Sequence, residues 1–88
     1  MDLFEMFFDE YEEEAWNSYA ICFETVGEQI DGVPQEIVNA VYAILGERTG
    51  YDWLHKPLHN FNGKSAVELV KTEKGEKALK AFIMRMPN

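Results

Sequence analysis

Two histidines, one cysteine and a run of carboxylates are the side chains in this chain whose types and spacing could support chemistry. His55 and His59 lie four residues apart, a spacing that on a helix would place two imidazoles beside one metal ion. Pro57 stands between them and should break that helix, and neither a second cysteine nor a nearby carboxylate pair completes a four-ligand set. We therefore expect no metal site, with His55 hydrogen-bonded at a helix end and His59 on a loop surface.

The remaining candidates do not indicate catalysis. Cys22 lies between Tyr19 and Val26 in an apolar stripe, so we expect a buried, neutral thiol and not a nucleophile activated by a neighbouring base. The carboxylates near residue 12 are typical of a solvated face rather than of an acid–base pair in a cleft. The Asn-Gly-Lys-Ser segment over 62–65 lacks the upstream glycine of a phosphate-binding loop. These residues predict a protein that is not an enzyme and has no cofactor.

Size and composition indicate a single folded domain over residues 1–88. The chain is 47% apolar and 14% aromatic, too rich in both for a disordered acidic segment. One cysteine allows no internal disulfide, and no signal-type leader opens the sequence. Its apolar runs are far shorter than the roughly 20 residues that span a bilayer. We expect a soluble, cytoplasmic, all-α protein.

Charge is divided sharply along the chain, whose formal net charge is −8. Residues 1–47 hold twelve Asp and Glu and no Lys or Arg, whereas residues 48–88 hold eight Lys and Arg against four acids. Phosphates are attracted only by cationic surface, so direct DNA binding through the first half is not expected. The acidic half should face something basic.

The first 30 residues show helical periodicity. Apolar side chains recur every three or four positions, which predicts one long acidic helix over residues 2–30 that would break, if anywhere, near Gly27. The stripe comprises Phe4, Phe8, Tyr11, Ala15, Tyr19, Cys22, Val26 and Ile30. Phe7, Trp16 and Phe23 widen it beyond the needs of one partner helix. That excess predicts either wrapping by the rest of the domain or a homodimer seam through residues 2–30.

Start and stop signals place the central elements. Pro34 suits a first helical turn and Gly46 suits the position after a last turn, which predicts a central helix over 34–45. Thr49 begins a capping-box spacing, and Pro57 should end the short helix predicted over 50–56.

The last third of the chain contains a loop followed by two further helix starts. Asn62-Gly63 favours positive φ. Ser65 begins a second capping box before a short helix over 65–71. Thr72 begins a corner before a C-terminal helix over 73–86, whose lysines at 74, 77 and 80 should lie outside its apolar stripe.

Capping and turn signals are dense after residue 50, and a known protein family shows a similar pattern. The second half, over about residues 40–86, resembles the C-terminal toxin-binding domain of the Xre, MbcA and ParS antitoxins, so that residues 34–88 form the antitoxin-like part of the domain. We interpret the matching residues as scaffold: Trp53, Leu54, Pro57, Gly63, Ser65, Glu68, Leu69, Thr72 and Gly75. Such antitoxins usually carry a helix-turn-helix region first, whereas this chain begins with an acidic helix.

The resemblance implies a binding role for the C-terminal helix and tail. In such antitoxins this element reaches into the active-site cleft of a RES-domain toxin, an enzyme that consumes NAD. The residues implied to contact the partner are Lys77, Lys80, Ala81, Met84, Arg85, Met86, Pro87 and Asn88. Methionine is flexible and polarizable, so a helix end that carries it can adapt to a pocket.

Two other hypotheses remain open. In the first, the protein is an acidic decoy, encoded by a phage or mobile element, that imitates phosphates and occupies a nucleic-acid-binding protein. Its binding face would comprise Asp9, Glu10, Glu12, Glu13 and Glu14. In the second, the protein is an interaction module of unassigned role. A homodimer is compatible with each hypothesis.

Overall fold

The computed structural model describes residues 3–23 and 27–86 and is all-α, as predicted. Its helices are α1 (Leu3–Glu10), α2 (Glu13–Ala20), α3 (Gln35–Leu45), α4 (Glu47–His55), α5 (Ala66–Leu69) and α6 (Glu73–Met84), with a 3-10 turn, η1 (His59–Phe61), before α5. Within the described residues the only extended pairing is a single antiparallel bridge between Leu58 and Lys64.

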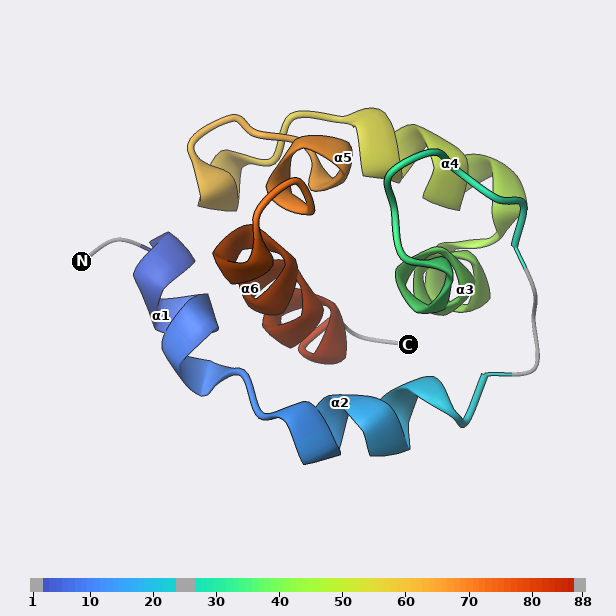
Figure 1. The fold of residues 1–88 in the computed structure, drawn as a ribbon. Coiled ribbons are helices and arrows are strands. Elements are labelled where there is room, and N and C mark those ends of the chain that lie inside the picture. The colour runs from blue at the N-terminus through green and yellow to red at the C-terminus, as the bar shows by residue number, and fades with distance from the viewer. Residues whose placement is uncertain (1–2, 24–26, 87–88) are drawn as a thin grey trace.

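Helix α6 lies in the middle of the fold (Figure 1), where it contacts α1, α2, α3 and α5. The other helices curve around it, and α4 packs on α3 and α5 at the far side. The largest fully buried side chains come from α2, α3, α4, η1 and α6: Trp16, Ile37, Val38, Val41, Leu54, Phe61, Leu79 and Ile83. One core therefore joins the acidic and the basic halves of the chain.

The predicted single helix over residues 2–30 is wrong. The chain leaves helical geometry at Tyr11 and Glu12, where Glu12 is extended with φ −134° and ψ 122°, and α2 ends at Ala20. The buried side chains are Phe7 and Trp16, which lie nine residues apart, or about two and a half helical turns. On one straight helix they would point in opposite directions, so a break is required to place both in the same core. The expected break near Gly27 concerns a region partly outside the described residues.

The break also changes which stripe residues are buried. Cys22, expected in the core, is exposed, and its Sγ lies 3.3 Å from the Ser18 carbonyl oxygen. Ala15 is exposed and Tyr19 is half-buried, while Val26 lies outside the described residues. The buried side chains of the N-terminal segment are thus Phe7 and Trp16, beside the predicted stripe, whereas Phe4, Phe8 and Tyr11 of the stripe are half-buried against the core.

The central helices agree with the prediction except at one boundary. Helix α3 ends at Leu45, and the φ of 87° at the following Gly46 matches the position after a helix end. Helix α4 then begins at Glu47 rather than at 50, because Gly46 also serves as its N-cap and Thr49 lies inside the helix. The helix ends at His55, and Lys56, directly before Pro57, is extended as proline requires.

The turns after residue 56 follow the sequence signals closely. Asn62 and Gly63 have φ of 58° and 83°, which confirms the predicted positive φ. Ser65 and Glu68 form the predicted capping box at the start of α5. Helices α5 and α6 are each about two residues shorter than predicted at their carboxy ends.

Candidate partner-binding surface

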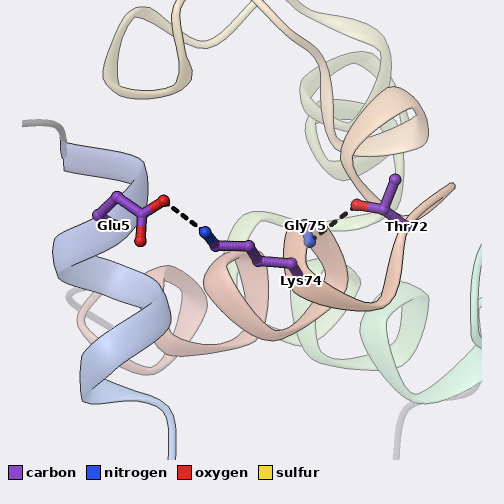
Figure 2. Close-up of polar contacts among 4 residues, drawn as sticks. All are labelled: Glu5, Thr72, Lys74 and Gly75. Carbon is purple, nitrogen blue, oxygen red and sulfur yellow. Dashed lines mark hydrogen bonds and ion pairs between the residues drawn. The ribbon is translucent and has the colours of Figure 1, made fainter.

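The amino end of α6 is fixed by a cap and a close backbone approach. Thr72 Oγ1 accepts a hydrogen bond from the backbone N–H of Gly75 at 3.0 Å (Figure 2). A Cβ at Gly75 would lie only 2.0 Å from the carbonyl oxygen of Leu69, so a side chain at this position would collide with the backbone of α5. The glycine thereby lets α6 pack directly beneath α5.

Helix α1 lies along α6 and is tied to it near both ends. Glu5 forms an ion pair with Lys74, which Figure 2 shows reaching across from α6. The Lys74 ammonium also lies 5.1 Å from the ring centroid of Phe8. Eleven residues after Lys74, directly past the end of α6, Arg85 Nη2 donates to Glu10 Oε1 at 2.6 Å. The acidic half therefore faces the basic half of its own chain.

Lys80 lies at the centre of a buried ionic contact, contrary to the prediction that it lies outside the apolar stripe. Only 7% of the residue is exposed, and its Nζ lies 3.0 Å from carboxylate oxygens of both Glu36 and Glu76. It also lies over the Trp16 ring, 5.4 Å from the centroid. Burial alone would lower the pKa of Lys80, but its hydrogen bonds to Glu36 and Glu76 outweigh that effect, so its pKa is raised. Lys80 thus joins α6 to α2 and α3.

The carboxy end of α6 is accessible, as is its first turn, where the side chain of Glu73 is 82% exposed. The side chain of Arg85 is 62% exposed, and Met84 and Met86 are half-buried. A shallow pocket beside them is lined by Glu10, Ala81, Met84 and Arg85. A partner could therefore reach the last turn of α6 without disturbing the core.

The other predicted contact residues occupy different environments. Lys77 is half-buried and forms an ion pair with Glu73, one turn earlier on α6, at 3.1 Å. Ala81 is buried, although it forms part of the floor of the shallow pocket. Pro87 and Asn88 lie outside the described residues. Within the described residues, the structure thus groups Ala81, Met84, Arg85 and Met86 at one end of the helix.

The residues interpreted as scaffold support α6 from α4 and α5. Leu54 is fully buried, whereas Trp53 is half-buried and its ring stacks on Phe82 with 6.2 Å between centroids and an interplanar angle of 7°. Ser65 and Leu69 are buried beside α6. Their positions are those of a support for α6 and not of a cluster of reactive groups.

The acidic residues predicted as a binding face are exposed on α1, α2 and the connector between them: Asp9, Glu10, Glu12, Glu13 and Glu14. Among the described residues, only Glu10 of this set takes part in an ion pair. The other four carboxylates face solvent. They form an acidic edge beside the contact between α1 and α6.

The described residues hold no group of three or more His, Cys, Asp or Glu placed to bind a metal ion. His55 Nδ1 lies 3.0 Å from the Tyr51 carbonyl oxygen, so the predicted local hydrogen bond at a helix end is confirmed, and His59 is exposed as expected. Across residues 3–23 and 27–86, no helix has the length and hydropathy needed to cross a bilayer.

Sequence reasoning missed the residues that attach α1 to α6. The sequence pattern places Phe7 beside the stripe and indicates no role for Glu5 or Lys74. Two signals in the sequence point to this attachment: the opposite charges of the two halves, and an apolar face too broad for one helix. Both are explained once the two halves of one chain are packed together.

Residues 40–88 match the protein family described as "Antitoxin Xre/MbcA/ParS C-terminal toxin-binding domain". The match covers α4, η1, α5 and α6 and most of α3. No curated protein and no solved structure matches the chain. The matched region therefore contains the helix whose exposed end is described above, whereas α1 and α2 lie outside it.

Proposed function

Because the chain belongs to the family of antitoxin Xre/MbcA/ParS C-terminal toxin-binding domains, we propose that it neutralises a RES-type, NAD-consuming toxin by placing the end of α6 in the active-site cleft of that enzyme. Its action is binding and not catalysis. The partner is a protein, as the family description implies.

The observation that carries this proposal is the contrast along α6. Lys80 and Leu79 are buried among neighbouring helices, which hold the helix in a fixed position. Arg85 projects from the next turn and is 62% exposed. A helix that is rigid at its base and exposed at its tip loses little conformational entropy on binding. Lys80 therefore supports the helix, and Met84, Arg85 and Met86 contact the toxin.

The chemistry of the tip suits a cleft that offers a carboxylate beside apolar surface. The Arg85 guanidinium presents planar, charge-assisted donors to such a carboxylate. Met84 and Met86 supply adaptable apolar surface beside it. Glu10 holds Arg85 in the free protein, so binding exchanges that partner for a group of the toxin.

An inhibition assay tests the proposal. The chain is co-expressed with the RES-type enzyme that we expect in the neighbouring reading frame, and NAD consumption is measured against antitoxin concentration. Arg85→Glu combined with Met84→Ala should raise the concentration for half-inhibition at least tenfold while the protein stays folded by circular dichroism. Glu13→Gln combined with Glu14→Gln is the matched control and should inhibit like the unaltered chain. Equal inhibition by all three proteins contradicts the proposal.

The acidic decoy is the second candidate, and the exposed carboxylates of Asp9 and Glu12 to Glu14 favour it. Against it, Glu10 is already paired with Arg85, and Glu5 with Lys74, so part of the acidic surface is neutralised within the chain. If the protein is an acidic decoy, Glu13→Gln combined with Glu14→Gln should lose partner binding. Arg85→Glu combined with Met84→Ala should keep it. The same two proteins therefore separate the two functions.

A further inference from the structure

The connector between α1 and α2 contains no residue that stops a helix. From Leu3 to Ala20 the sequence has neither glycine nor proline. Glu12, at the N-cap of α2, makes no side-chain capping hydrogen bond. Glutamate is a good helix former, and a cap of Ser, Thr, Asp or Asn is the usual signal for a new start. The break at Tyr11 and Glu12 is therefore imposed by packing and not by local sequence.

The packing that imposes it is the attachment of α1 to α6. The Phe7 ring lies 5.2 Å from the Phe82 ring and 5.7 Å from the Phe61 ring, centroid to centroid. Glu5 and Glu10 add ion pairs at either end of the contact. If α1 leaves α6, the cause of the break is removed, and residues 3–20 can form one continuous helix.

In that continuous helix Phe7 and Trp16 point to opposite sides, for the reason given above. Trp16 would stay in its own core against α3 and α6, and Phe7 would face away from it. The face that carries Phe7 would then be available to a second molecule, whose α6, freed of its own α1, presents Phe82, Lys74 and Arg85.

We propose that α1 exchanges between two copies of this chain. Tyr11 and Glu12 become helical, and α1 of each copy docks on α6 of the other, where Glu5 and Glu10 meet Lys74 and Arg85 of the second copy. The exchanged dimer keeps every α1–α6 contact and gains the helical hydrogen bonds of the connector, while association reduces translational freedom. Exchange is therefore favoured by high protein concentration. It does not rest on the proposed function, although Lys74 and Arg85 lie in the matched region, because its test measures the association of two copies and not toxin binding.

Two charge-altered variants test the exchange. Variant A carries Glu5→Lys and Glu10→Arg, and variant B carries Lys74→Glu and Arg85→Glu. Within each variant, α1 and α6 repel one another, in the monomer and in a dimer of like copies. In an exchanged dimer of A with B, both contacts again join opposite charges. The two proteins are refolded together from denaturant and examined by sedimentation velocity and light scattering.

We expect at least tenfold more dimer in the mixture than in either variant alone, with recovered helical circular dichroism. A mixture that stays monomeric, or that fails to fold, overturns the proposal. Non-specific attraction is excluded by mixing B with a variant that carries Glu12→Lys and Glu14→Arg, residues outside the α1–α6 contact. Dimer in that control mixture at the level of A with B also overturns it.

A proline tests the continuous helix itself. Glu13 is the first residue of α2, a position where proline is tolerated, and the extended Glu12 before it already has the conformation that proline requires. In a continuous helix the same proline would lose a hydrogen bond and collide with the carbonyl of Asp9. Glu13→Pro in both A and B should reduce the dimer at least tenfold. An undiminished dimer means that exchange does not proceed through a straightened connector and contradicts the proposal.

Discussion

The ring of Phe7 meets the ring of Phe82 edge to face, with 5.2 Å between centroids and an interplanar angle of 90°. This contact joins the acidic segment to the helix at the centre of the family domain. Edge-to-face aromatic pairs add to the free energy of burial, because the positive edge of one ring meets the negative face of the other.

Phe7→Ala should therefore lower the free energy of unfolding by about 3–5 kcal/mol, the usual cost of removing a buried phenylalanine side chain. The measurement is denaturant unfolding followed by circular dichroism. Leu3→Ala, on the same helix but 40% exposed, is the control and should cost less than about 1 kcal/mol. If the two variants are equally stable, α1 does not pack on α6 as described.

Gly75→Ala should destabilise the protein, although alanine normally favours a helix by about 1 kcal/mol over glycine. The added Cβ would lie 2.0 Å from the Leu69 carbonyl oxygen, so α5 and α6 must separate. Overpacking of this kind costs roughly 1–3 kcal/mol. Thermal unfolding compares it with Thr49→Ala, an exposed helical position that should be neutral or slightly stabilising. A higher melting temperature for Gly75→Ala would be the contrary result.

The stability of the fold should fall above pH 10 in a way that depends on Tyr42. Burial raises the pKa of the Tyr42 phenol to about 12, and its hydrogen bond to Glu28 at 3.1 Å acts in the same direction. An unfolded tyrosine ionises near its ordinary value of 10.0, so the unfolded chain releases its proton first. The resulting stabilisation is complete below that value and is lost as the pH rises through about 12.

Tyr42→Phe removes the ionisable group and should make the decline shallower between pH 10 and about 12. Denaturant midpoints measured across this range provide the comparison. Parallel decline of the unaltered protein and the variant would show that Tyr42 does not contribute to the pH dependence.

Local signals predicted most of the second half of the fold. Caps and turns depend on a few adjacent residues, so the Ser65 capping box and the positive φ of Asn62 and Gly63 were readable from the sequence. The family resemblance over about residues 40–86 agrees with the match over 40–88.

The errors arise where tertiary contacts override local pattern. The helical periodicity of residues 2–30 continues through Tyr11, and only the need to bury Phe7 and Trp16 together breaks it. The same rearrangement exposes Cys22. The sequence predicts Lys80 on the surface, because its ion-pair partner Glu36 is distant in sequence. These features depend on which helices pack together. The periodicity of the sequence does not specify that.

Hydrogen exchange of the chain, free and in complex with the proposed RES-type partner, shows whether the end of α6 is the part that binds. We expect backbone amides at Met84, Arg85 and Met86 to gain at least tenfold protection on binding, while those at Glu12 to Glu14 are unchanged. Protection confined to the acidic residues, with the end of α6 exchanging as it does in the free protein, would contradict the proposed function.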